Sequence, residues 1–178
     1  IFLDELGKLY SARVKNEPSG LPEANSFTQY ALDQKKFSQS NDYRRIEQFW
    51  LDQFKDSVPV LDLPTDFARP AIRTNKSNRI DTILDKYLFS DIKAFSNKQG
   101  SSLAITLRTV FEILLYKLSG QDDIVLGLPS AGQAITDNNH LMGHCINLLP
   151  IRCRLKDEMT FTQYLKERKF ATLDAYDN

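Results

Sequence analysis

The chain has 178 residues, 42% of them hydrophobic, and its 23 basic side chains balance 23 acidic ones. A chain of this length removes roughly 70% of its unfolded surface from water, which is enough for one good core. The neutral balance lacks the broad positive field that nucleic-acid binding needs, so we exclude that class of partner. The densest apolar stretch, residues 102–118, is interrupted by Arg108, Glu112 and Lys117, so we expect no membrane-spanning helix.

The cysteines and the start of the chain bear on its cellular setting. Cys145 and Cys153 lie in one short segment and do not make a disulfide framework, which fits a reducing, cytoplasmic setting. No signal peptide is visible. The chain opens with Ile1, already inside an apolar-periodic segment, which we interpret as a sign that it is a piece of something longer.

The first third of the chain predicts three amphipathic helices. Apolar residues recur at helical spacing over residues 3–14, 26–37 and 42–56, and Ser26 is suited to cap the second helix. Residues 58–78 contain three prolines and little periodicity. They predict an extended connector.

The pattern changes after the connector. Residues 79–89 are rich in β-branched and aromatic residues and predict a strand, followed by a short helix capped by Ser90 and ending at Gly100. Residues 103–119, with Ser101 or Ser102 as the cap and Gly120 as the stop, predict the central helix of the fold. Its apolar residues Leu103, Leu107, Val110, Phe111, Leu114 and Leu118 fall on one face and Ile105, Ile113 and Tyr116 fall elsewhere, so we expect this helix to be packed on several sides.

Two strands and a last helix complete the predicted elements. Residues 123–129 form a short, continuously apolar run, typical of a strand in a sheet covered on both faces. Residues 146–155 predict a strand in which Asn147 is the one polar group on an apolar face and Pro150 requires either a sheet edge or a bulge. Thr160 and Gln163 predict a capping box that opens a helix to about residue 176.

The alternation of helices and strands in the second half places the chain in the α/β class. The apolar stripe of the last helix consists of Phe161, Tyr164, Leu165, Ala171 and Ala175. The basic groups around it, Lys166, Arg168 and Lys169, are interpreted as solvated surface, as are Arg69, Arg73, Lys76 and Arg79.

The residue types that carry chemistry do not assemble a recognisable catalytic pattern. His140 and His144 are four apart, but Gly143 and the strand that follows make a helix there unfavourable, so we expect no bound metal. Ser130 is not in a nucleophile-elbow sequence. Cys153 is interpreted as a small apolar core residue.

Five blocks of the chain match, in order, the pattern of a known family: residues 2–12, 26–34, 49–70, 125–133 and 142–152. The identities that carry the match are Tyr30, Trp50, Asp66, Arg69, Gly127, Pro129, Gly132, Gly143, Asn147 and Arg152. Together these blocks resemble the condensation domain of nonribosomal peptide synthetases. The chain departs from the family pattern at Phe27, Gln29, Gln133, Cys145 and Leu148.

The resemblance implies a fold similar to chloramphenicol acetyltransferase, with a mixed sheet flanked by helices. It places residues 1–178 in a single partial domain, most of the C-terminal lobe. That lobe would have a helical part over about 1–58, a connector over about 58–78 and an α/β part over about 79–178. The family's catalytic motif, two adjacent histidines followed by Asp-Gly, would end just before Ile1, so we expect this chain alone to be inactive.

The implied reaction is amide formation between a donor acyl thioester and an acceptor aminoacyl thioester. Each is held on the 4'-phosphopantetheine of a carrier domain, and the chain itself binds no cofactor directly. The implied partners are carrier domains and adjacent adenylation domains of a larger synthetase. The alternatives are a noncatalytic docking module of the same fold and an epimerisation domain.

The resemblance also suggests roles for single residues. We expect Asn147 to line the substrate tunnel, the alternative being that it satisfies backbone groups near Pro150. Structural roles are expected for the other matched residues, namely Tyr30, Trp50, Asp66, Arg69, Gly127, Pro129, Gly132, Gly143 and Arg152.

Overall fold

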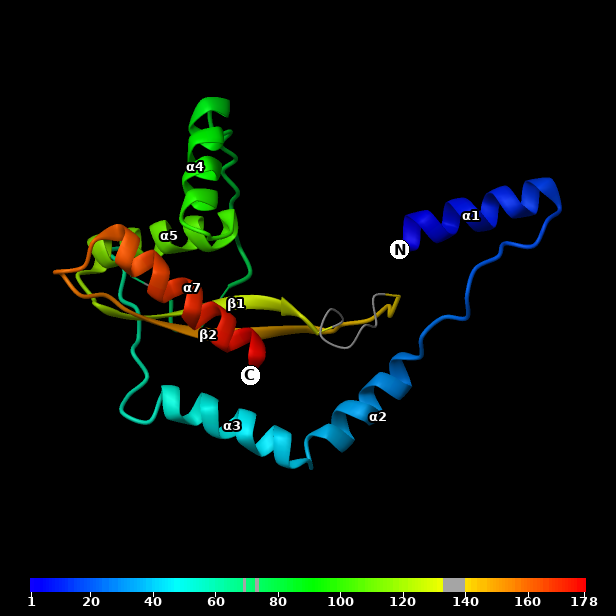
Figure 1. Cartoon of the computed structure of the whole chain (residues 1–178), viewed down its shortest axis with the longest axis horizontal. Helices are drawn as coiled ribbons and strands as arrows, with labels where there is room; N and C mark the ends of the chain where they lie inside the picture. Colours follow the sequence, from blue (N-terminus) through cyan, green and yellow to red (C-terminus); the bar gives the residue numbers. More distant parts are fainter. Residues whose placement is uncertain (69, 73, 133–139) are drawn as a thin grey trace. The chain divides into compact units, whose positions relative to one another are not determined.

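A computed structural model describes residues 1–68, 70–72, 74–132 and 140–178. The described elements are, in chain order, α1 (Phe2–Lys15), α2 (Phe27–Phe37), α3 (Asn41–Gln53), α4 (Lys86–Lys98), α5 (Leu103–Ser119), β1 (Asp123–Ala131), β2 (Ile146–Arg154) and α7 (Phe161–Asp177) (Figure 1). They divide into two compact units. The first comprises Ile1–Gln48 and Pro129–Leu148, and the second comprises Phe49–Leu128 and Leu149–Asn178.

Most helix boundaries follow from local chemistry, as predicted. The Ser26 hydroxyl accepts from the Gln29 N–H and the Ser102 hydroxyl from the Ile105 N–H, each at 3.2 Å. Gly120 ends α5 with a φ of 71°, a left-handed conformation in which a glycine avoids Cβ strain. Thr160 and Gln163 form the predicted capping box of α7. The three early helices, the central helix and the last helix are therefore confirmed.

The predicted strand over residues 79–89 is wrong. Residues 79–85 have no regular structure, and residues 86–89 form the first turn of α4. The Asp85 carboxylate accepts from the N–H groups of Tyr87 and Leu88, so Asp85 and not Ser90 caps this helix. A β-branched sequence becomes a strand only when another strand pairs with it, and the described sheet contains only β1 and β2.

The sequence predicts that α5 is packed on several sides, whereas among the described residues one of its faces is exposed. The buried residues of this helix are Thr106, Thr109, Glu112 and Leu115, which recur every three residues. The helix packs against α7. The opposite face is exposed and carries Leu107, Val110, Phe111, Leu114 and Leu118. On the buried side, Glu112 is paired with Arg108 of α5 and Arg168 of α7.

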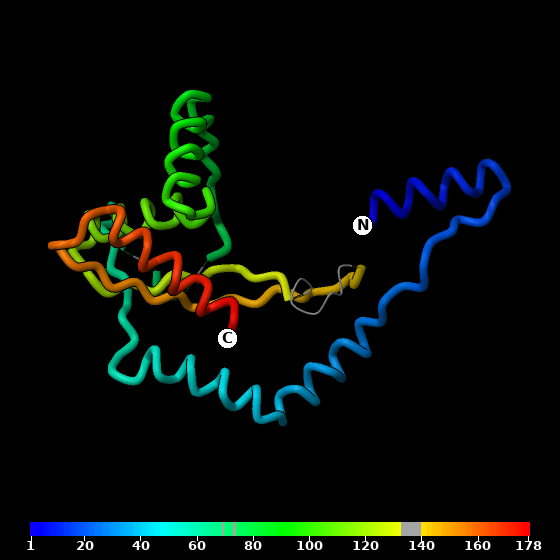
Figure 2. The backbone as a smooth tube through the Cα atoms, in the orientation of Figure 1, coloured from blue at the N-terminus to red at the C-terminus, as the bar shows by residue number. Residues whose placement is uncertain are grey.

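The described strands form a two-stranded antiparallel sheet, and Figure 2 shows them side by side. The Gly132 N–H donates to the Cys145 carbonyl at one end, and the Leu155 N–H donates to the Asp122 carbonyl at the other. Both bonds keep the same register across strands of equal length, so no bulge intervenes and Pro150 is accommodated at a sheet edge. In β1, Gly127, Pro129 and Ala131 are exposed, so the expectation of cover on both faces fails for this segment.

The core lies in the second unit, between the sheet and the helices that pack on it. Its buried members, contributed by α5, both strands and α7, are Leu115, Ile124, Ile151, Cys153 and Ala175. Trp50 and the connector residues Leu61 and Leu63 pack against this cluster. Within the part of the chain that the structure describes, no helix has the length and apolar character needed to cross a bilayer.

Candidate functional site

Residues from three separate matched blocks meet around Gly132 in the first unit. A Cβ atom added to Gly132 would lie 2.8 Å from the Cys145 carbonyl oxygen and 3.1 Å from the Tyr30 hydroxyl. It would also lie 3.8 Å from Nδ2 of Asn147. The close approach of backbone and side chains therefore requires a glycine here. It brings together residues that are far apart in the sequence.

Helix α2 supplies Tyr30 to this cluster. The tyrosine is half-buried, and its ring centroid lies 5.8 Å from that of Phe27 in a tilted arrangement. Burial raises the pKa of Tyr30, and the adjacent Cys145 raises it further. A tyrosine hydroxyl is protonated at neutral pH even at its ordinary pKa of about 10, so this group can donate a hydrogen bond.

The ring of Phe27 covers Gly143, the glycine of the last matched block. A Cβ on Gly143 would lie 2.2 Å from a ring carbon of Phe27, so the two residues are packed without space for a methyl group. Phe27 departs from the family tyrosine, yet its ring still connects α2 to the segment that leads into β2. This contact holds the start of β2 next to Tyr30.

Asn147 lies near the start of β2 and is exposed. It stands on the same side of the strand as Leu149, Ile151 and Cys153, whose burial increases along the strand. Its side chain therefore lies at the exposed end of an otherwise apolar strand face. A carboxamide there presents two donors and one acceptor to a ligand.

Arg152 connects β2 to β1 and to the end of α3. Its guanidinium donates to both carboxylate oxygens of Asp123, at 2.8 and 2.6 Å, and to the Gln53 carbonyl at 2.7 Å. The guanidinium also lies 5.6 Å from the ring centroid of Phe54. The side chain is 5% exposed, so these contacts are made largely out of water. These contacts indicate a structural role for Arg152, which holds the two strands and the end of α3 together.

The remaining matched residues are spread over both units. The indole N–H of Trp50 donates to the Asn178 carbonyl at 3.2 Å. Gly127 faces Pro150 across the sheet in the register given above, and Gly127, Pro129 and Asp66 are all exposed. Arg69 lies outside the described residues, as do Arg73 and Gln133.

The histidines and cysteines show no shared site. His140 and His144 are both exposed, and the described ranges contain no group of three or more potential metal-ligating His, Cys, Asp or Glu side chains. Cys145 and Cys153 are buried and free. Burial, with the nearby Glu112 carboxylate, raises the pKa of Cys153 to about 12, so this thiol is neutral and unreactive, as the core interpretation predicted.

The second unit contains a buried polar network that the sequence analysis did not predict. Glu112 is fully buried and lies 3.0 Å from Nε of Arg108 and 3.2 Å from Nε of Arg168. It also accepts a hydrogen bond from the Tyr164 hydroxyl at 2.8 Å. Arg168 is 5% exposed, so its assignment to solvated surface is wrong. The available signal was the four-residue spacing of Arg108 and Glu112 in an otherwise apolar helix.

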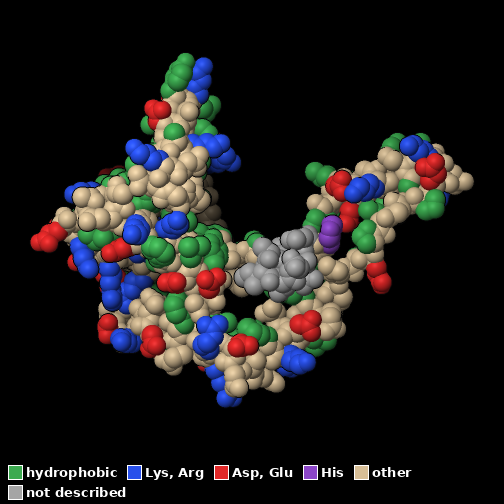
Figure 3. Space-filling model, in the orientation of Figure 1, with side chains coloured by type: hydrophobic (Ala, Val, Ile, Leu, Met, Phe, Trp, Pro, Cys, Tyr) green, Lys and Arg blue, Asp and Glu red, His purple; other side chains and the backbone are tan. Residues whose placement is uncertain are grey.

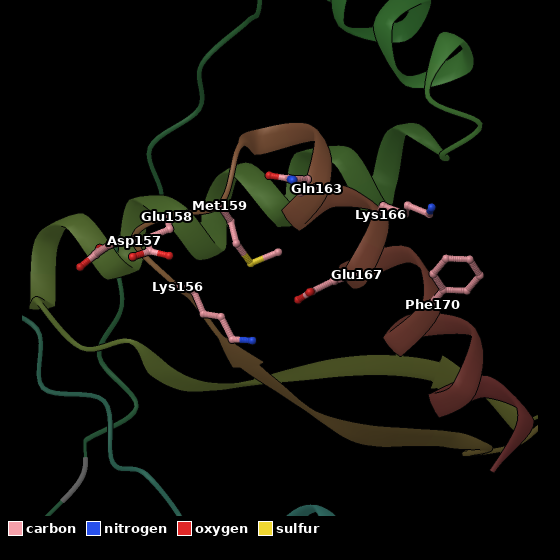
Figure 4. A pocket seen from close by; sticks show the side chains of 8 residues that line it. All are labelled: Lys156, Asp157, Glu158, Met159, Gln163, Lys166, Glu167 and Phe170. Atoms are coloured by element: carbon pink, nitrogen blue, oxygen red, sulfur yellow. The ribbon is translucent and has the colours of Figure 1, made fainter.

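A pocket of about 700 Å³ lies between the turn after β2 and α7, away from the matched residues. Figure 4 shows Lys156, Met159 and Glu167 pointing toward one another there. Charges of both signs line it, and the face in Figure 3 likewise has acidic and basic side chains interspersed. None of the motif residues named above lines this pocket, so we place the candidate site at the Gly132 cluster.

Comparison with known proteins identifies the family. The model of the condensation domain matches residues 1–178. The chain belongs to the condensation domain family. It is 34% identical over 178 residues to gramicidin S synthase 2 of Brevibacillus brevis, covering 100% of this chain and 4% of that protein. It is 33% identical over 178 residues to bacitracin synthase 1 of Bacillus licheniformis, covering 100% of this chain and 3% of that protein. The resemblance to condensation domains of nonribosomal peptide synthetases is thereby confirmed.

Solved structures show the same fold. The first condensation domain of the calcium-dependent antibiotic synthetase, in complex with a substrate analogue, matches with a TM-score of 0.76 and 18% identity. The match covers 97% of this chain and 38% of that one. The epimerization domain from the third module of tyrocidine synthetase B matches with a TM-score of 0.75 and 18% identity, covering 93% and 38%. The predicted fold class is confirmed, and the chain spans well under half of either solved chain.

Proposed function

We propose that this condensation-domain chain takes part in forming an amide bond between a donor acyl thioester and an acceptor aminoacyl thioester. The observation that carries the proposal, beside family membership, is the meeting of Tyr30, Gly132 and Asn147 from three separate matched blocks. The substrates would arrive on the phosphopantetheine arms of carrier domains, with adenylation domains as further partners. A cytoplasmic setting is part of the same proposal.

The proposed reaction is the aminolysis of a thioester. The acceptor amine attacks the donor thioester carbonyl, the C–N bond forms, and the C–S bond breaks as the carrier thiol leaves. The amine loses one proton, and the thiolate gains one. Holding both thioesters in place converts a bimolecular step into an effectively intramolecular one, which supplies much of the rate.

Asn147 is the residue that we assign to substrate contact. Its exposed carboxamide beside Gly132 could donate to an amide or carbonyl oxygen of a phosphopantetheine-bound substrate. A donor aimed at the developing oxyanion lowers the barrier because it binds the transition state more strongly than the ground state. Tyr30 and Gly132 would position the strand that carries it.

Two alternative functions differ from condensation in the reaction that they would carry out. An epimerisation domain has the same fold, as the tyrocidine synthetase neighbour illustrates, but would exchange the α-proton of the acceptor and form no amide. A noncatalytic docking module would bind carrier domains and leave both thioesters intact. The asparagine of the block at residues 142–152 favours condensation because it matches the condensation motif.

The test is Asn147→Ala in the intact parent domain. If the carboxamide acts in the transition state, single-turnover amide formation should fall on the order of 100-fold with an unchanged denaturation midpoint. If it only satisfies backbone groups, stability should fall by about 1–3 kcal/mol and turnover of the folded fraction should persist. Asn97→Ala, an exposed asparagine of α4, is the matched control and should change neither quantity.

A further inference from the structure

The second unit has another cavity, of about 460 Å³, lined by residues 52–56, by the end of β2 and by α7. Its charged lining consists of five basic and three acidic side chains: Lys55, Arg152, Arg154, Lys156 and Arg168 against Asp52, Asp56 and Glu167. The larger pocket in Figure 4 is lined by two basic and three acidic residues. Of these two cavities, the smaller one therefore has the positive balance.

Two of its cations are almost completely withdrawn from water. The side chains of Arg152 and Arg168 are 5% and 6% exposed. Arg152 directs its donors to Asp123 and to the Gln53 carbonyl. Arg168 donates from Nη2 to the Arg152 carbonyl at 2.9 Å, and its Nε lies 3.2 Å from Glu112. Nη1 of Arg168 donates to no described residue, so this end of the guanidinium is free to bind a ligand in the cavity.

The neighbouring carboxylates do not balance the arginines. Glu112 is shared between two arginines, and Asp123 is shared between Arg152 and Arg154. Two carboxylates thus serve four guanidinium groups. Arg154 makes long ion pairs, at 3.5 Å from Asp123 and 3.7 Å from the exposed Asp56. Because arginine stays charged in proteins, this arrangement leaves positive charge at the cavity.

We propose that this cavity binds a tetrahedral oxyanion, with a phosphate group, free or esterified, as the ligand class. Guanidinium groups present planar donor pairs that match phosphate oxygens, and such charge-assisted hydrogen bonds are stronger than neutral ones. Arg168 would bind the anion from the buried side and Arg154 from the exposed side. Lys55 and Lys156 are exposed, make no ion pair with a described residue and add positive charge. The proposal does not depend on amide formation.

The test is equilibrium dialysis of radiolabelled inorganic phosphate against the intact condensation domain of the parent, at constant ionic strength. We expect one saturable site with a Kd below about 1 mM. Arg154→Ala should weaken binding at least about tenfold, the usual effect of losing one charge-assisted hydrogen bond. Lys93→Ala removes an exposed cation of α4 and is the control, expected to change the Kd less than about twofold because distant surface charges are screened.

A second variant should act in the opposite direction. Asp56→Asn removes the carboxylate that competes for Arg154 and should tighten phosphate binding at least about twofold. An unchanged or weaker affinity of this variant would overturn the proposal. The same holds for equal effects of Arg154→Ala and Lys93→Ala.

Repeating the dialysis with glycerol 3-phosphate distinguishes the two sources of the phosphate group. Tighter binding than that of inorganic phosphate would support the site and assign it to a phosphate ester, and weaker binding would support it and assign it to free phosphate. Absence of saturable binding of both would overturn the proposal. Because the readout is phosphate binding and not amide formation, its failure is distinguishable from failure of the proposed function.

Discussion

Glu112 connects the buried face of α5 to α7, a contact that apolar patterning alone does not reveal. The carboxylate is fully buried between Arg108 and Arg168 and accepts from Tyr164. A charge buried this completely is tolerated only when it is paired and hydrogen-bonded. Glu112 and the two arginines therefore each compensate a charge that would otherwise be buried without a partner.

Replacing this carboxylate should therefore be costly. Glu112→Ala leaves Arg168 buried without its counter-ion, and the expected loss is about 3–5 kcal/mol of unfolding free energy in the parent domain. Urea denaturation followed by far-UV circular dichroism measures it. Glu167→Ala, an exposed acid of α7, is the control and should cost less than about 0.5 kcal/mol. Equal effects of the two variants would contradict the role of the network.

The Asp123–Arg152 pair makes a pH-dependent contribution to stability. Hydrogen bonds from Arg152 hold the pKa of Asp123 below its ordinary value, against an opposing effect of burial. The stabilisation is thus fully present above the unfolded pKa, about 3.9, and is lost as the pH falls through the lower folded value. Between pH 5 and 3, the urea midpoint of Asp123→Asn should fall less than that of the unmodified domain. Asp122→Asn, at an exposed neighbour, should follow the unmodified profile.

The candidate site was predictable at some residues and not at others. Tyr30, Gly132 and Asn147 were identified from the family pattern, but only the fold shows that they meet. The contact of Phe27 with Gly143 was not foreseeable, because Phe27 departs from the pattern. Arg168 was misassigned because a basic side chain in a charged segment has the same sequence pattern whether it is solvated or paired with a buried acid such as Glu112.

At the scale of elements, helix ends were predicted well because capping is local. The Ser26, Ser102 and Thr160 caps depend on hydrogen bonds that span three residues. The strand expected at residues 79–89 failed because strand formation depends on a distant partner, whereas Asp85 begins a helix with two local hydrogen bonds. Local interactions prevailed over intrinsic strand preference in this segment.

The start of α4 can be tested directly. Asp85→Ala removes the acceptor for two backbone N–H groups and should cost about 1 kcal/mol, within the usual range for an N-cap. Ser90→Ala, inside the helix, should be neutral or slightly stabilising because alanine favours helices. Thermal denaturation of both variants distinguishes the caps. A larger loss from Ser90→Ala would restore the cap that the sequence suggested.

At the scale of the whole molecule, the α/β class followed from the alternation of helices and strands in the sequence. The family followed because blocks in fixed order are specific together. The packing of the second unit did not follow, since hydrophobic periodicity marks an apolar face without identifying what covers it. In α5 the core lies on the polar side, and the apolar side faces outward. In a chain that forms only part of a domain, an apolar stripe on a helix does not have to face the core formed by that chain.

The most direct measurement is product analysis by mass spectrometry with the intact parent domain and donor and acceptor carrier domains loaded with thioesters. We predict an amide joined to the acceptor carrier and no such product when this chain is supplied alone. Incorporation of deuterium from D₂O at the acceptor α-carbon without amide would assign epimerisation instead. Intact thioesters on carriers that nevertheless bind the domain would contradict catalysis and indicate a docking module.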